Sequence, residues 1–555
     1  MDRRTVLALV LVAAVILLTP RLFPPPPRAP LSPADSIGLA DSTRRAADTA
    51  ATAVTPAPAV VAQRDTAVVR TPAETLHVAD TNAAFAFVNK GAALERVELR
   101  HYKSLSKALG GRDGQVQLEG RGAPLLKFRG IVGRDTIRFD TATFRVVRNE
   151  ARGTTTQIAM EGVVATDTLA IDYDIDPDSF LVHVDGRVRG PLATNGFILM
   201  DFAPTLGSYE ADSIDDQRHT GFAYEIAHRG SKGTAFGKLD PGEQMLVPGP
   251  LTWVALKNKY FIVGVLARDS LSPMAELRMT GLARSSRIAT RAQGTTVIQP
   301  QQGGFALDVY AGPQQSTRLH ALGRDFENSN PYGGFLQPVV QPFAGLVLKI
   351  LLWMRHTFNI GYGWVLVIFG VAVRFILWPL NQTAMRTSMK MQRIQPELQA
   401  LQTRYKSDPQ KLQTEMMRVY KEHGMSPFSM FSGCLPLLLP MPVLFALFFV
   451  FQSTIEFRGV PFMWLADISQ KDPFYILPLL MGVSMFVLSW IGSRNTPPNP
   501  QTKMMMYMFP VMMTFLLANL ASGLNLYYAV QNLAALPQQW LISNERAKAA
   551  AKKKG

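Results

Sequence analysis

One arginine, Arg374, lies well inside a long apolar stretch of the sequence, where a charge is unfavourable. The stretch covers residues 360–380 and is long enough for a helix to cross a lipid bilayer. In the middle of such a helix an arginine costs about 2.5–3.5 kcal/mol on insertion scales. We therefore expect Arg374 to face a polar partner or water, and not lipid.

Polar and small side chains recur at helical spacing around Arg374 and along the last apolar stretch, 524–542. Both stretches are expected to run toward the cytoplasm, which brings Arg374 and Asn532 to a similar depth. Two interpretations stay open: the helices enclose a wet cavity that opens inward, or Arg374 is buried and joins the helices through hydrogen bonds. The candidate residues of this polar face are Gly370, Arg374 and Trp378 in the first helix and Asn525, Tyr528, Asn532 and Gln539 in the last.

The apolar stretches lack the acidic and histidine side chains that pumps and metalloproteases use. None of the eight histidines and no Asp or Glu lies well inside one of them, and the sequence has no glycine-rich phosphate loop. The single cysteine, Cys434, excludes an intramolecular disulfide framework. We therefore expect no metal, no cofactor and no enzymatic activity.

Five apolar stretches must position these groups, and the charges that flank them predict the topology. The segments on the inner side are basic, as the positive-inside rule requires, whereas the loop 456–473 is poor in Lys and Arg. The N-terminal apolar stretch after Arg3 and Arg4 is short enough for either a signal peptide or a membrane anchor. As an uncleaved anchor, together with this pattern, it places both termini in the cytoplasm. The net charge of +15 therefore needs no specific nucleic-acid partner. The five stretches are 360–380, 435–455, 474–491, 504–520 and 524–542.

The pattern of the sequence changes three times before the membrane core. Residues 24–80 are rich in Ala, Pro, Thr and Asp, which predicts a disordered linker. Residues 81–322 alternate between apolar and polar side chains and are broken by turn residues, which predicts a large antiparallel β-sandwich outside the membrane. Within residues 323–358, the stretch 335–358 is apolar but interrupted by prolines and charges, which favours an amphipathic helix in the interface.

Two short amphipathic helices are predicted between the first two of the five stretches. Asp408 is expected to cap the second of them, with Pro409 as its first residue and Gly424 just after its end. The pair is either a hairpin held by its own apolar stripes or, in addition, a surface that receives incoming chains. The stripes are Ile394, Leu398, Leu401 and Tyr405, then Leu412, Met416, Val419 and Tyr420, and the basic residues include Lys390 and Arg393.

Several motifs follow one another along the chain in an order that is itself informative. They are Trp253-Val-Ala-Leu-Lys-Asn-Lys-Tyr-Phe, Arg374-Phe-Ile-Leu-Trp-Pro-Leu, Gly433-Cys-Leu-Pro-Leu-Leu, Tyr475-Ile-Leu-Pro-Leu-Leu-Met-Gly-Val and Ser522-Gly-Leu-Asn-Leu-Tyr-Tyr. This set resembles the YidC insertase family (YidC/Oxa/Alb), in the Gram-negative type with a large periplasmic domain. The chain departs from that family at Asn519-Leu-Ala-Ser-Gly, where many members have a Phe-Pro-Ser-Gly corner.

The resemblance implies roles for particular residues. Arg374 matches the arginine of the family's hydrophilic groove, and Tyr527 and Tyr528 match its aromatic pair. Glu415 matches the acidic position of the cytoplasmic hairpin. The third and fifth spans of the family form an apolar slide for substrate helices, although simple contact with lipid would explain the methionines here equally well. The slide would comprise Leu438, Leu444, Phe448, Met505, Met508 and Met512.

The resemblance also implies an organisation for the whole chain, of mixed fold class: a polytopic α-helical membrane core plus a periplasmic antiparallel β-sandwich. Six transmembrane helices are expected in all, five of which form the insertase core. The expected parts are a transmembrane anchor (1–23), a disordered periplasmic linker (24–80), the β-sandwich (81–322), an amphipathic interfacial helix (323–358), the membrane core (359–545) with a cytoplasmic helical hairpin (382–424), and a basic cytoplasmic tail (546–555).

The function implied is that of a membrane protein insertase and chaperone of the bacterial inner membrane. It would act through a groove open to the cytoplasm and to lipid, alone or with the Sec translocon. Its expected partners are nascent membrane proteins and the lipid bilayer, with the Sec translocon and the ribosome as further candidates. Two alternatives remain: a small-solute channel or transporter that uses the same cavity, or a β-sandwich that binds sugars or periplasmic partners while the spans anchor it.

Overall fold

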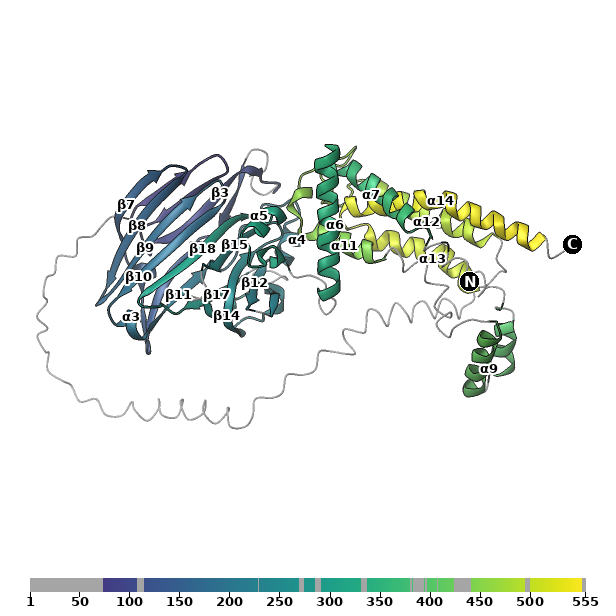
Figure 1. The fold of residues 1–555 in the computed structure, drawn as a ribbon, viewed down its shortest axis with the longest axis horizontal. Coiled ribbons are helices and arrows are strands. Elements are labelled where there is room, and N and C mark those ends of the chain that lie inside the picture. Colours follow the sequence, from purple (N-terminus) through teal and green to yellow (C-terminus); the bar gives the residue numbers. More distant parts are fainter. Residues whose placement is uncertain are drawn as a thin grey trace, which may run out of the picture. The chain divides into compact units, whose positions relative to one another are not determined.

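The structure is a computed structural model that describes most of the chain from residue 73 onward (Figure 1). The predicted anchor, most of the predicted linker, Leu438, Lys390, Arg393 and Gly424 lie outside the described residues. The described residues are 73–106, 114–227, 229–268, 274–284, 291–330, 337–379, 382, 394, 397–406, 408–423, 441–494 and 500–551.

Residues 73–330 form a β-domain in which eighteen strands belong to one continuous hydrogen-bonded network (Figure 1). Neighbouring strands pair antiparallel, which confirms the predicted antiparallel β-sandwich. The strands are β1 (Thr75–Ala79), β2 (Ala83–Val88), β3 (Ala93–Lys103), β4 (Gln115–Glu119), β5 (Leu126–Val132), β6 (Asp135–Ile137), β7 (Arg145–Arg152), β8 (Thr155–Val164), β9 (Asp167–Asp176), β10 (Leu181–Arg189), β11 (Gly196–Phe202), β12 (Gly221–Ile226), β13 (Gly230–Ala235), β14 (Gln244–Lys257), β15 (Phe261–Ala267), β16 (Met274–Gly281), β17 (Ala292–Ile298) and β18 (Gly304–Pro313).

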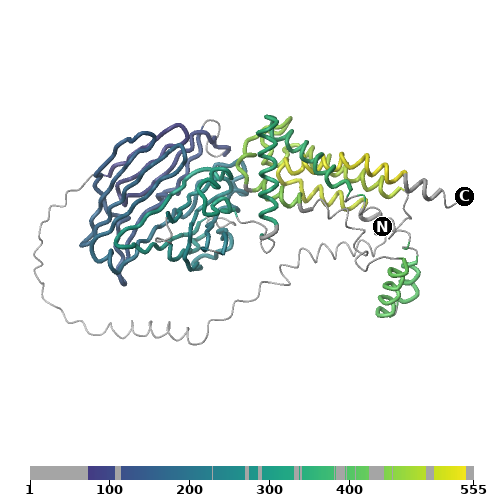
Figure 2. Tube along the Cα trace, in the orientation of Figure 1, coloured from purple at the N-terminus to yellow at the C-terminus, as the bar shows by residue number. Residues whose placement is uncertain are grey.

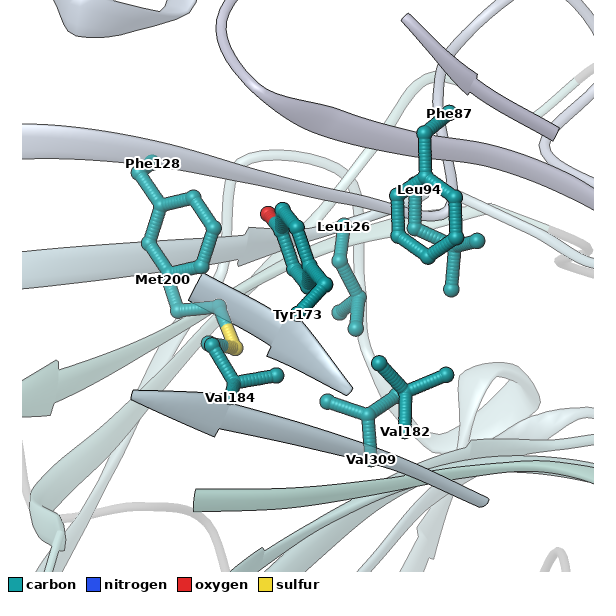
Figure 3. A pocket seen from close by; sticks show the side chains of 9 residues that line it. All are labelled: Phe87, Leu94, Leu126, Phe128, Tyr173, Val182, Val184, Met200 and Val309. Atoms are coloured by element: carbon teal, nitrogen blue, oxygen red, sulfur yellow. The ribbon is translucent and has the colours of Figure 1, made fainter. Parts of the chain in front are cut away.

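The alternation that predicts these strands also builds their core. Along β9, every second side chain is buried, and β17 shows the same period of two. The inward side chains come from strands far apart in the sequence and close against one another (Figure 3). Nine residues surround the gap left between them, and its volume is only about 10 Å³, which leaves room for no more than about one water. The sandwich is therefore filled by its own side chains at this place.

Both predicted boundaries of the β-domain are too narrow. Strand β1 lies within the range predicted as a linker. It belongs to the β-domain because it pairs with β2 and because its side chains Leu76 and Val78 are buried in the core. At the other end, Phe326 is fully buried, and its ring lies 5.2 Å from that of Trp253. Residues 323–330 therefore belong to the β-domain, and the predicted interfacial helix begins only at Gln337.

Helices and the loops that connect them make up the rest of the described chain (Figure 2). The longer ones form a helical region (337–379 and 441–551), apart from α9 of the hairpin. Short helices interrupt the β-domain. The helical elements are η1 (Phe139–Thr141), α3 (Pro191–Asn195), α4 (Ser213–Arg218), η2 (Phe236–Lys238), α5 (Ser316–Ala321), η3 (Phe326–Ser329), α6 (Gln337–Phe358), α7 (Tyr362–Ile376), α9 (Pro409–Glu422), α11 (Met441–Ser453), η6 (Ile455–Phe457), α12 (Ile476–Ser493), α13 (Pro500–Leu517) and α14 (Ser522–Ala551).

The helical region presents apolar side chains outward, as a lipid-facing surface requires. Among the described residues, twenty-five large hydrophobic side chains are exposed in the helical region and only five in the much larger β-domain. Of the helices in the described part of the chain, α12 is long and apolar enough by itself to cross a bilayer, with a mean hydropathy of 1.9 over 18 residues. Helices α6 and α7 bend by 117° at their break, so α6 turns away from the direction of α7. The other four predicted spans are helical here but shorter or less apolar than α12 within the described residues.

The described residues of the predicted helical hairpin pack against one another as expected. Asp408 caps α9 by accepting a hydrogen bond from the Lys411 backbone N–H at 3.1 Å, and Pro409 is the first helical residue, as expected. The predicted stripes meet, and the buried residues are Ile394, Leu398, Val419 and Tyr420.

Candidate functional site around Arg374

The site begins with a close approach of α7 and α14 at Gly370. A Cβ atom at this position would lie 3.2 Å from Cγ1 of Val530 and 3.5 Å from the Tyr527 ring, so a side chain that extends beyond Cβ would collide with them. The ring of Tyr527 also packs on Phe369 of α7, with the ring centroids 5.9 Å apart. One turn further along α7, this packing brings Arg374 against α14.

Within the part of the chain that the structure describes, Arg374 is held by an amide and not by an acid. Its Nη2 donates a hydrogen bond to Oε1 of Gln538 at 2.8 Å, and Nε2 of Gln538 donates to the Trp378 carbonyl oxygen at 3.3 Å. The Nε atom of Arg374 is buried and makes no hydrogen bond. Among the described residues, no carboxylate lies within 4.0 Å of the guanidinium. The positive charge is therefore only partly compensated, by dipoles.

The residues of α14 that face α7 differ from those expected. Tyr527, Gln531 and Gln538 lie on one side of the helix, and Nε2 of Gln531 donates to the Tyr527 hydroxyl at 2.9 Å. Gln531 and Gln538 are both buried. The polar face predicted from the sequence does not include them, although helical spacing counted from Tyr527 instead of Tyr528 selects this face.

The predicted α14 residues contact the other helices. Nδ2 of Asn532 donates to the Met481 carbonyl oxygen of α12 at 3.4 Å. Nδ2 of Asn525 donates to the Leu517 carbonyl oxygen of α13 at 3.0 Å, and its Oδ1 is buried without a hydrogen bond. Tyr528 packs in the apolar core, and Gln539 lies against Gly492 of α12. The predicted polar residues of the first helix, Gly370, Arg374 and Trp378, thus contact α14. The predicted residues of α14, Asn525, Tyr528 and Asn532, make the described contacts with other helices instead of with α7.

The predicted slide residues differ in how far their side chains are buried. Leu444 is buried in the helical core, whereas Phe448 and Met508 are half-buried and Met512 is exposed. The side chain of Met505 lies outside the described residues. Among the side chains of α11 and α13 that the structure describes, the exposed large apolar ones are Phe445, Tyr507, Val511, Met512, Phe515 and Leu516.

The acidic hairpin position makes a local ion pair. Oε2 of Glu415 lies 2.9 Å from Nη2 of Arg418, one helical turn further along α9, and Arg418 also lies 3.4 Å from Glu422. Such exposed pairs on one helix contribute about 0.3–0.5 kcal/mol. The pair leaves the side chain of Glu415 partly accessible for other contacts.

Comparison with known proteins covers both parts of the chain. The family model described as YidC periplasmic domain matches residues 75–346, and the model described as 60Kd inner membrane protein matches residues 353–550. The membrane protein insertase YidC of Anaeromyxobacter sp. (strain Fw109-5) is 29% identical over 406 residues, covering 72% of this chain and 70% of the relative. The protein of that name from Chlorobium phaeovibrioides (strain DSM 265 / 1930) is 30% identical over 403 residues, with 68% and 67% covered. Among solved structures, the crystal structure of an active YidC insertase with its first transmembrane domain resolved is 19% identical, covers 85% of this chain and 93% of that one, and has a TM-score of 0.34.

Proposed function

Because this chain belongs to the YidC family of membrane protein insertases, we propose that it inserts membrane proteins through a hydrophilic groove built on Arg374. In this proposal the groove opens to the cytoplasm and to lipid. The chain acts alone or together with the Sec translocon, and the cytoplasmic hairpin with Glu415 receives the incoming segment. Both termini lie in the cytoplasm and the β-domain lies in the periplasm.

The observation that carries the proposal is the incompletely compensated charge of Arg374. Among the residues that the structure describes, its guanidinium has one hydrogen bond, to the amide of Gln538, and its buried Nε has none. A buried donor without a partner costs about 1–3 kcal/mol, and more when it is charged. An acidic or polar segment of a substrate would supply the missing acceptors, so binding such a segment would relieve this cost.

Insertion then divides into two steps that need no energy-coupling group. The polar segment of the substrate first leaves water for the site at Arg374, which shortens its path through hydrocarbon. The apolar segment next moves into lipid along the exposed surface of α11 and α13 that contains Phe445 and Met512. Each fully buried Leu or Phe side chain contributes about 1.5–3 kcal/mol, so a segment of some twenty apolar residues supplies ample driving force.

Reconstitution with a single-span substrate tests the proposal. Liposomes that contain the purified chain should insert a substrate with an acidic translocated tail well above the level of empty liposomes. Equal insertion with and without the protein would refute the proposal. Ion or solute flux through the same liposomes, without insertion, would instead support the channel alternative.

A further inference from the structure

The loop between α11 and α12 (454–475, the outer loop) contacts the β-domain through a buried ion pair of Arg458, and Ile455 of the same loop is buried in the core of the β-domain. The side chain of Arg458 is only 6% exposed, and that of its partner Glu210 only 2%. Nε of Arg458 lies 2.9 Å from both carboxylate oxygens of Glu210, and its Nη2 donates to the Lys103 carbonyl oxygen at 2.9 Å. The guanidinium also lies 5.4 Å from the centre of the Phe261 ring.

The outer loop in turn fixes the first turns of two long helices. The backbone N–H groups of Ser522 and Gly523, at the start of α14, donate to the carbonyl oxygens of Gln470 and Ile468 at 2.6 and 2.9 Å. The carboxylate of Asp472 accepts from the backbone N–H of Leu477 at 2.7 Å, at the start of α12. The loop thus satisfies backbone donors that a helix leaves free at its N-terminus.

The same loop fills the space between the ends of the helices. Phe457, Phe462, Leu465 and Ile468 are buried in the helical core. A Cβ atom at Gly363 would lie only 2.0 Å from the Phe462 ring, which shows how tightly the loop is seated against the start of α7. A movement of the loop would therefore disturb α7, α12 and α14 together.

From these contacts we propose that Arg458 is a positioning residue for insertion. By binding Glu210 and the Lys103 carbonyl oxygen, Arg458 fixes the outer loop to the β-domain. The loop in turn covers the ends of the helices that face the β-domain. With the loop in place, α14 keeps Gln538 opposite Arg374 while a substrate segment occupies the site. This inference rests on the proposed function and its topology.

The energetics of buried ion pairs predict a distinctive pattern of variants. Removal of Arg458 alone leaves Glu210 buried beside Asp216, with Lys259 as the nearby positive charge. Breaking a buried pair in this way is strongly destabilising, whereas replacing both partners by apolar residues of similar volume is often neutral. Arg458→Met should therefore release the loop, and the double variant Glu210→Leu with Arg458→Met should keep it in place.

A cysteine probe measures the position of the loop without any assay of insertion. Ser469 is buried in the outer loop beside Tyr260 of the β-domain, so Ser469→Cys, made together with Cys434→Ser, reports loop release through its reaction with a membrane-impermeant maleimide. Arg458→Met should raise the labelling rate by about tenfold or more. The apolar double variant and Lys471→Met, which removes an exposed charge of the same loop, should leave the rate within about twofold. Equal labelling of all variants would overturn the proposal.

Chemical rescue then tests whether position is what matters for insertion. Glu210→Cys with Arg458→Cys, again with Cys434→Ser, should insert poorly when reduced and recover when a short reversible thiol cross-linker joins the two cysteines. Failure to recover, with the cross-link verified by mass, would overturn the positioning role. If the unmodified chain itself shows no insertion above empty liposomes, the proposed function fails, and the labelling rates still decide whether Arg458 holds the loop.

Discussion

Nη2 of Arg374 donates a hydrogen bond of 2.8 Å to the side-chain oxygen of Gln538, which lies 164 residues later in the chain. The bond joins α7 to α14. The Nε2 atom of Gln538 in turn donates a hydrogen bond to the Trp378 carbonyl oxygen. The side-chain amide of Gln538 thus orients Arg374, the only arginine of α7, and also binds the backbone just after the end of that helix.

Gln538→Leu should destabilise the chain by about 1.5–3 kcal/mol, because a hydrogen bond to a charged group is lost and Arg374 stays partly buried. Gln539→Leu, one residue further along the same helix, makes no such bond to α7 and should cost less. Unfolding of the two purified variants in detergent compares them. Equal destabilisation would show that the amide of Gln538 does not hold Arg374.

Gly370→Leu should destabilise the contact of α7 and α14 by about 1–3 kcal/mol, because its side chain would meet Val530 and Tyr527. Gly345→Leu in α6 is the matched control, since no atom lies within 4 Å of a Cβ placed there. Thermal unfolding of both variants measures the difference. A Gly370→Leu variant as stable as the control would contradict the close approach of the two helices.

Glu456→Gln should make stability less dependent on pH. Burial raises the pKa of Glu456 from 4.5 to about 7, against the opposing effect of the backbone N–H groups of Ser316 and of Glu456 itself. A carboxyl with a raised pKa stabilises the folded state below pH 4.5, and this contribution is lost as the pH rises through about 7. The variant should therefore gain about 1–3 kcal/mol over the wild type at pH 8 and much less at pH 5.

The control for this pH dependence is Glu150→Gln on β7, where the glutamate is exposed. Its effect should stay within about 0.5 kcal/mol at both pH values. Unfolding curves at pH 5 and pH 8 provide the measurement. A gain for Glu456→Gln that is the same at both pH values would mean that the carboxyl does not titrate in this range.

Much of the architecture follows from the sequence because it depends on local periodicity. The alternation of apolar and polar residues in strands such as β9 predicts the sandwich. The apolar stripes of two helices, which contain Leu398 and Val419, predict the hairpin. Where the prediction of boundaries is wrong, long-range contacts are the reason. Leu76 joins the β-domain by pairing with β2, and Phe326 joins it by packing on Trp253.

The candidate site could be predicted only in part, because two polar faces compete on α14. Arg374 stands out by its charge alone, and Gly370 and Trp378 follow from it by helical spacing. On α14, however, Tyr527 with Gln538 and Tyr528 with Asn532 are equally regular. The contact of Gly370 with Tyr527 decides between them, and that contact depends on how two distant helices pack. Nothing in the local sequence singles out Arg458, because its partner Glu210 lies 248 residues away.

The central claim is that the charge of Arg374 draws acidic segments into the membrane, and one comparison tests it most directly. Insertion into liposomes is measured for Arg374→Ala, Arg374→Lys and the wild type, each with two substrates that differ only in having an acidic or a neutral translocated tail. Two charges 4 Å apart interact by about 4 kcal/mol at an effective dielectric constant of 20. We therefore expect Arg374→Ala to reduce insertion of the acidic tail by about tenfold or more and that of the neutral tail by less than about twofold, with Arg374→Lys close to wild type. An equal reduction for both tails, or none for either, would contradict the account.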